Sequence, residues 1–188
     1  MNLILAMSLE SAQVAGRMAV AVLIVSGSTL GGLAQDEKFM SVAYVPVKGD
    51  VYTIGYGSTK GVKKGDKITP ERALIRLLDE VENVYADGIK KCITAPLHQY
   101  EYDAYLRLAY NIGVGAFCKK SDDPKKPNLI DLINSQRYAE ACARISEFNG
   151  KYTTNDRGER VRVVLPGLVK RRAEERAVCE GKRKGYQQ

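Results

Sequence analysis

The sequence contains no tryptophan, only one histidine (His98), and no Cys-x-x-Cys pair among its four cysteines. Zinc sites in proteins are built from clustered Cys and His ligands at short spacings, so we expect no metal site. Acidic residues are outnumbered by basic ones. The chain has 29 Lys and Arg and 22 Asp and Glu, which gives a net charge of +7. This charge suits an anionic partner such as nucleic acid, a membrane surface or a wall polymer. The basic residues are scattered rather than interleaved with aromatics on one helix, which argues against nucleic acid.

Charged residues are absent from Met18 to Ala34, a run of 17 residues that follows Arg17. Nine of the 17 are Gly, Ala, Ser or Thr, so the run is only weakly hydrophobic. As a single helix it would span about 26 Å, slightly less than a hydrocarbon core of ~30 Å. We therefore expect residues 1–35 to be a membrane or export segment and residues 36–188 to be the folded domain. Arg17 favours a cytoplasmic N-terminus and a periplasmic remainder.

No cysteine precedes Cys92, and the others are Cys118, Cys142 and Cys179. An even number of cysteines after an export-like segment predicts two disulfides formed in an oxidising compartment. Three pairings are possible, and small buried thiols are the alternative.

Three short motifs follow one another along the rest of the chain. In the first, an acid at a helix end, a second acid in a Gly-flanked turn and a threonine that opens a Gly-rich strand can line one cleft. Glycoside hydrolysis by paired carboxylates requires this layout, in which one acid protonates the leaving oxygen and the other orients water. The motifs are Glu37 to Gly57 (with Ala43-Tyr44, Asp50 and Thr53-Ile54-Gly55-Tyr56-Gly57), Ala109 to Phe117, and Pro166 to Arg172.

Through these motifs the sequence resembles the phage-type lysozymes, glycoside hydrolase family 24, over about residues 36–180. The resemblance implies an α+β, mostly α-helical fold of two lobes, the smaller of which is built on a β-hairpin. Here a transmembrane or signal-anchor-release helix would precede that fold. The resemblance also implies hydrolysis of the β-1,4 bond between N-acetylmuramic acid and N-acetylglucosamine in peptidoglycan, with inversion and without a metal or organic cofactor.

The resemblance assigns roles to individual residues. Glu37 is the expected general acid, and Thr53 is expected to help hold the attacking water. Asn111, Gly55 and Tyr56 are expected to bind substrate. We expect Asp36 to be a solvated neighbour of Glu37.

The sequence departs from the family pattern at three places. Pro46 stands where the family has its catalytic Asp, so we assign the orientation of water to Asp50, three residues before Thr53. The alternative is that Gly49-Asp50 is only a turn-forming pair. Ser58 replaces a usual histidine and so removes an ion pair between the lobes, and the Trp often found before Pro166 is missing. We expect these last two changes to alter stability rather than activity.

Several helices are expected from local signals. Thr69-Pro70-Glu71 predicts the start of a long helix that links the lobes, and Thr94-Ala95-Pro96 predicts the start of the next. The apolar face of this next helix is expected to be core, with His98 facing solvent; its members are Tyr102, Tyr105, Leu106, Ala109 and Tyr110.

The C-terminal part is expected to hold two helices, Tyr138 to Phe148 and one that begins near Pro166. The family packs these two helices together, which implies a Cys142–Cys179 disulfide and leaves Cys92 with Cys118. Residues 149–165 are expected to be a glycine- and charge-rich connection, and residues 119–127 a solvated loop. Arg171 and Glu175 are four residues apart and are expected to pair on the surface of the last helix.

Three hypotheses remain for residues 1–35. They are a signal peptide cleaved near Ala34, a permanent anchor, and a signal-anchor-release segment like that of endolysins of some lambdoid phages. The small residues of the segment favour release, and the absence of cysteine from residues 1–36 means that release would be steric rather than disulfide-controlled. We then expect an inactive enzyme in the host inner membrane, facing the periplasm, which becomes a soluble monomer once a holin-type protein depolarises the membrane.

Two other functions stay open. The chain could be a membrane-anchored peptidoglycan-binding protein that keeps the fold without catalysis, which the missing Asp at its usual place would suit. It could also damage the envelope through the basic C-terminal helix alone.

Overall fold

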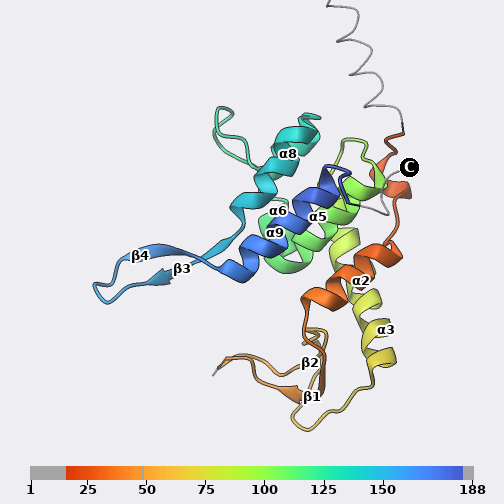
Figure 1. Cartoon of the computed structure of the whole chain (residues 1–188), viewed down its shortest axis with the longest axis vertical. Coiled ribbons are helices and arrows are strands. Elements are labelled where there is room, and N and C mark those ends of the chain that lie inside the picture. The colour runs from red at the N-terminus through yellow and green to blue at the C-terminus, as the bar shows by residue number, and fades with distance from the viewer. Residues whose placement is uncertain (1–15, 48, 184–188) are drawn as a thin grey trace, which may run out of the picture.

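The computed structural model describes residues 16–47 and 49–183 of the chain. It has a helical body from which two β-hairpins project on the same side (Figure 1). The lower hairpin belongs to the small lobe and the upper one to the body. The expected mixture of helices with a small hairpin lobe is therefore present, together with a second hairpin that was not expected.

The small lobe is built on strands β1 (Met40–Tyr44) and β2 (Thr53–Gly55), which pair antiparallel. Gly55 has a φ of 65°, and a Cβ there would lie 3.0 Å from the Cβ of Ala73. Only glycine tolerates both this backbone conformation and this close approach. The hairpin is thereby pressed directly onto the helix that carries Ala73.

That helix begins where the sequence predicted it. Helix α3 (Pro70–Glu80) is capped by Thr69, whose hydroxyl accepts the N–H of Arg72 at 3.4 Å. It runs on without a break through the π-helical turn η2 (Val81–Ala86) into α4 (Asp87–Lys90). These elements connect the small lobe to the body.

Helix α5 (Gln99–Ile112) is the centre of the body, because residues 101–109 are all buried. Its aromatic residues Tyr102 and Tyr105 are core, as expected. The helix starts later than predicted, since the side chain of Glu101 accepts the N–H of His98 at 2.8 Å and so fixes His98 as the N-cap. His98 is half-buried and stacks on Tyr100 with ring centroids 4.8 Å apart, so it does not simply face solvent.

The rest of the body consists of short helices and the long C-terminal helix. Residues 119–127 form the expected exposed loop between α6 and α7. The predicted helix over 138–148 is present as α8 followed by the 3-10 turn η3. The bounds are α6 (Val114–Phe117), α7 (Leu129–Asn134), α8 (Tyr138–Arg144), η3 (Ile145–Glu147) and α9 (Pro166–Cys179).

Residues 149–165 are not the irregular connection that we expected. They form strands β3 (Gly150–Thr154) and β4 (Arg160–Val164), with Gly150 opposite Val164 and Thr154 opposite Arg160. The turn is closed by Asn155, whose side-chain oxygen accepts the N–H groups of Arg157 and Glu159. The β-branched residues of these strands favour the hairpin, although the many charges beside them are typical of an irregular connection.

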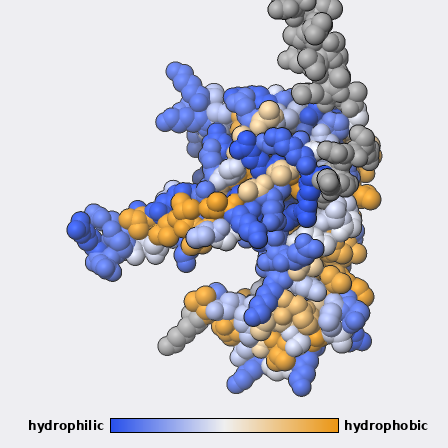
Figure 2. All heavy atoms as spheres, in the orientation of Figure 1, coloured by the Kyte–Doolittle hydropathy of each residue, from blue (hydrophilic) through white to orange (hydrophobic). Residues whose placement is uncertain are grey.

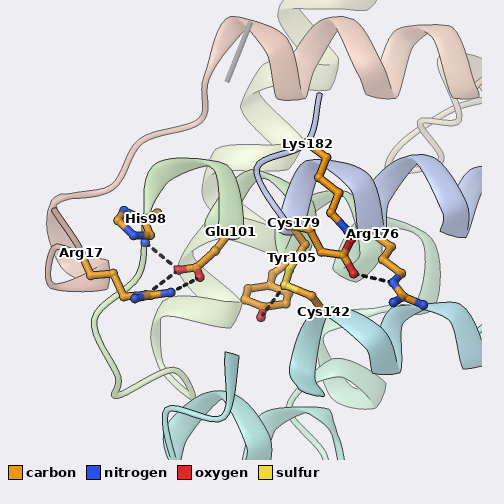
Figure 3. The surroundings of a disulfide bond; sticks show 9 residues. Arg17, His98, Glu101, Tyr105, Cys142, Arg176, Cys179 and Lys182 are labelled. Carbon is orange, nitrogen blue, oxygen red and sulfur yellow. Dashed lines mark hydrogen bonds and ion pairs between the residues drawn. A yellow bond between two sulfur atoms is a disulfide. The ribbon is translucent and has the colours of Figure 1, made fainter. Parts of the chain in front are cut away.

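Both disulfides have the pairing that the resemblance implied. Cys92–Cys118 joins the end of the linking helices to the end of α6, and Cys142–Cys179 joins α8 to α9. Figure 3 shows the second bond buried between its two helices, with the Tyr105 hydroxyl 4.0 Å from the Cys142 sulfur.

Residues 18–34 do not form the continuous helix that we predicted. They form the 3-10 turn η1 (Val20–Val22), an extended stretch, and helix α2 (Gly27–Asp36). Ser26 interrupts the run, because its hydroxyl caps α2 by accepting the N–H of Thr29 at 3.0 Å. Leu23 and Leu33 are fully buried in the core. Among the residues that the structure describes, no helix is both long and apolar enough to span a bilayer.

Polar groups of α5 hold this segment at three points along its length. Arg17 pairs with Glu101 at 2.7 Å (Figure 3), and the Ser26 hydroxyl donates to Asp103 at 2.8 Å. At the far end, Asp36 pairs with Arg107 at 2.7 Å. Burial raises the pKa of Asp103, and the hydrogen bonds from Ser26 oppose that shift. Glu101, Asp103 and Arg107 are each almost fully buried, so the packed segment supplies partners that help to offset the cost of burying these charges.

Candidate functional site

Glu37 lies where α2, the small lobe and α9 meet. It is the C-cap of α2, and its N–H donates to the Leu33 carbonyl at 3.0 Å. Its carboxylate accepts a hydrogen bond from Arg171 of α9 at 3.0 Å, and the side chain is 28% exposed. A Cβ on Gly57 would lie 3.9 Å from the same carboxylate. The acid is thus held on one side while remaining open to solvent.

The hydroxyl of Tyr110 lies on the small-lobe side of Glu37. Tyr110 of α5 donates to the Tyr56 carbonyl at 2.9 Å, and its ring packs 4.8 Å from that of Tyr85. Burial raises the pKa of Tyr110, and the nearby Glu37 raises it further. The hydroxyl therefore keeps its proton and stays a donor, which ties the loop after β2 to α5 beside Glu37.

Arg171 is shared by three carboxylates. Besides Glu37, it pairs with Asp36 at 3.4 Å and with Glu175 at 3.2 Å. Glu175 also pairs with Arg172 at 2.9 Å and is fully buried. The predicted Arg171–Glu175 pair is therefore present, but its expected place on the surface is wrong, because α9 packs this face against α5. Three carboxylates drawing on one guanidinium weaken its hold on each of them.

Asp36 is not the solvated neighbour that we expected. Its side chain is only 12% exposed, and it pairs with Arg107, which is 1% exposed. Burial alone would lower the pKa of Arg171, but Asp36 and the other two carboxylates raise it. Burial raises the pKa of Glu175 against the pull of Arg172 and Arg171. The cluster fixes the end of α2, and with it the backbone of Glu37.

Asp50 lies in the loop between β1 and β2, and Thr53 follows it at the start of β2. Asp50 is exposed, and its N–H donates to the Val47 carbonyl at 2.9 Å. Its carboxylate forms no hydrogen bond or ion pair with any described residue, so the structure does not tie it to Glu37. Thr53 opens β2, is 7% exposed, and donates its hydroxyl to the Val51 carbonyl at 3.4 Å.

The three predicted substrate-binding residues differ in exposure. Gly55 is buried beneath α3, which gives it a structural reason to be glycine. Tyr56 is half-buried against Phe39, with ring centroids 5.4 Å apart. Asn111 is exposed near the end of α5. Ser58, which stands in place of the family's histidine, donates its hydroxyl to Glu80 at 3.0 Å and so still joins the β2 loop to α3.

Sequence reasoning missed three residues beside Glu37. Arg171 and Tyr110 lie within the third and second motifs, so the order of the motifs could have pointed to them as partners of the first. Asp36 offered no such signal, because its partner Arg107 is 71 residues away. In the part of the chain that the structure describes, no group of three or more His, Cys, Asp or Glu is placed to hold a metal ion.

Replacing Asp36 by asparagine is expected to lower the free energy of unfolding by about 3–5 kcal/mol, because it leaves the buried Arg107 without its counter-charge. Adding Arg107→Met should recover part of this loss. Asp122→Asn, in the exposed loop, is the matched control and should change stability by less than about 0.5 kcal/mol. Urea unfolding measures all of these variants; a double variant no more stable than the single one would contradict the buried ion pair.

Comparisons with known proteins show the family to which the chain belongs. The model of the phage lysozyme family matches residues 34–175. A SAR-endolysin of Pseudomonas phage phiKMV is 35% identical over 155 residues, which cover 81% of this chain and 86% of that protein. An endolysin of Acyrthosiphon pisum secondary endosymbiont phage 1 is 35% identical over 129 residues, covering 69% and 80%. The solved endolysin of Escherichia coli O157:H7 phage FAHEc1 has a TM-score of 0.68 at 30% identity, over 84% of this chain and 94% of that one.

The fold is therefore the two-lobe lysozyme fold, and the class of protein is a glycoside hydrolase. More specifically, the chain belongs to the phage lysozyme family, and it is a phage endolysin of that fold. The resemblance to the phage-type lysozymes, which three sequence motifs indicated, is confirmed.

Proposed function

We propose that the chain is a muramidase that cleaves the β-1,4 bond between N-acetylmuramic acid and N-acetylglucosamine in peptidoglycan. Glu37 acts as general acid and protonates the leaving oxygen, while Asp50 orients the attacking water with the help of Thr53. The observation that carries this proposal is the setting of Glu37, a half-open carboxylate at the junction of both lobes with Arg171 and Tyr110 beside it.

The shared cation is compatible with an acid role. The Arg171 guanidinium lies 3.0 Å from the Glu37 carboxylate. Asp36 and Glu175 pair with the same guanidinium. Glu37 therefore shares this cation with two other acids, and its side chain stays 28% exposed and accessible to a substrate.

We further propose that residues 18–34 first anchor the enzyme in the host inner membrane, facing the periplasm, and that the packed arrangement is the released, active form. The SAR-endolysin name of the phiKMV relative supports this proposal. While the segment is in the bilayer, Asp36 cannot reach Arg107 and the backbone of Glu37 is not fixed. Release needs no disulfide exchange, since all four cysteines are already paired within the body. A holin-type protein that depolarises the membrane would trigger it, giving a soluble monomer in the periplasm.

Fractionation of cells that express the chain tests both parts. Before collapse of the membrane potential, we expect membrane-bound protein with an intact N-terminus and no activity on purified peptidoglycan. After collapse, the same protein should be soluble and should release new reducing ends. Soluble, active protein that begins at Gln35 before collapse would show a cleaved signal peptide and reject release, while the proposed chemistry would stand.

A further inference from the structure

The unexpected β3–β4 hairpin, residues 150–164, projects from the body as a free arm (Figure 1). Its root is firmly attached, because the Leu165 N–H donates to the Asn149 carbonyl at 2.9 Å and Arg162 donates to the Glu147 carbonyl at 2.7 Å. Along the arm, Tyr152 is 60% and Val164 49% exposed. A two-stranded hairpin is only marginally stable alone in water, and these apolar groups remain largely uncovered.

The register gives the arm two different faces. Tyr152, Thr154, Arg160 and Arg162 lie on one face, and Lys151, Thr153, Val161 and Val163 lie on the other. On the first face, the Arg160 guanidinium lies over the Tyr152 ring, 4.3 Å from its centroid. This contact holds an exposed aromatic ring and a cation together as one flat platform. Such a platform suits a ligand that presents both an apolar surface and acidic groups.

The same face borders a concave surface on the body. Tyr152 and Arg162 line a cavity of about 740 Å³ whose other walls include Lys119, Arg144 and Phe148. Glu147 also lines the cavity and is paired with Arg144 at 3.1 Å. The cavity therefore combines three cations and one acid with two aromatic rings and has a positive net charge. This lining suits an anionic ligand with flat apolar faces.

The arm is connected to the proposed catalytic acid through α9. Strand β4 leads directly into α9, which begins at Pro166 and carries the Arg171 that binds Glu37. The arm and the β1–β2 hairpin project on the same side of the molecule, and Figure 2 shows an open hollow between them. This hollow leaves room for a polymer strand beside the arm.

We propose that the first face of the arm is an accessory binding site for the peptidoglycan strand beyond the bond that is cleaved. Tyr152 stacks on a sugar ring, with Arg160 beneath it. Arg162 and Lys119 meet the carboxylates that the peptide stems of the strand carry. This inference rests on the proposed muramidase function and adds to it a preference for long strands.

The test is a charge-matched pair of double variants. Tyr152→Ala with Arg160→Gln removes the platform, whereas Lys151→Gln with Thr153→Ala changes the opposite face and also removes one charge. On purified sacculi we expect the first variant to raise KM about five- to tenfold and the second to leave it unchanged. On a short glycan fragment, both should match the wild type in kcat/KM. An unchanged KM on sacculi, or an equal loss on the short fragment, would overturn the proposal.

A binding measurement separates failure of the arm from failure of the proposed function. Co-sedimentation with sacculi is repeated in a Glu37→Gln background, in which no cleavage is expected. The platform variant should bind about five- to tenfold more weakly than Glu37→Gln alone. If the wild type does not cleave but this difference is present, the muramidase proposal fails and the binding site remains. If the two bind equally, the arm proposal is rejected.

Discussion

Replacement of Glu37 by glutamine is expected to lower kcat on peptidoglycan by roughly 10²–10⁴-fold, because a general acid contributes about that factor. Glutamine keeps the shape of the side chain and can still contact Arg171, so the fold and the affinity for peptidoglycan should be retained. The measurement is the rate of new reducing ends, together with the thermal midpoint and co-sedimentation with sacculi.

Glu82→Gln is the matched control, because Glu82 is an exposed acid on η2. It should leave all three measurements unchanged. Full activity of the Glu37 variant would remove Glu37 from the chemistry. Lysis of cells by that variant, without new reducing ends, would instead support envelope damage by the basic C-terminal helix. If the wild type binds sacculi without producing reducing ends, the chain is a binding protein with a lysozyme fold.

The sequence predicted the parts of the fold that depend on local signals or on the order of motifs. The cap at Thr69 and the buried face of α5 were found in this way, whereas the pairing of both disulfides followed from the family resemblance. Local signals failed where a tertiary partner decides the structure. The apolar run at 18–34 has the composition of a membrane segment. It packs onto α5 because Leu23 and Leu33 enter the core and because buried charges of α5 find polar partners in or beside the segment.

In the candidate site, too, some features could be predicted from local sequence and others could not. Glu37 could be predicted, because it stands at a fixed place in a recognisable motif. The sharing of Arg171 among three carboxylates could not, since those acids come from α2 and α9 and meet only after the body is packed. Asp50 remains a prediction, because its exposed carboxylate makes no contact that would fix its place in the cleft.

Leucine at both Gly27 and Gly31 is expected to trap the enzyme in the membrane and to prevent lysis after depolarisation. Each leucine near the helix centre favours insertion by roughly 0.3–0.6 kcal/mol. Both glycines are exposed in the packed form, and a Cβ at either one would meet nothing within 4 Å. The double variant should therefore have nearly wild-type activity when it is extracted in detergent and assayed on purified peptidoglycan.

Gly32→Ala, at the next position along α2, is expected to have the opposite effect: it should lower activity and leave release normal. A Cβ there would lie 2.9 Å from the Cζ atom of Arg107, so the guanidinium must move away from Asp36, the residue before Glu37. Alanine barely changes the apolar character of the segment, so release should be normal while activity on purified peptidoglycan falls.

The two variants thus separate the membrane role of residues 18–34 from their role in the folded enzyme. Normal lysis by the leucine variant would show that the bilayer does not hold this segment, and normal activity of Gly32→Ala would show that its packing on Arg107 does not position Glu37.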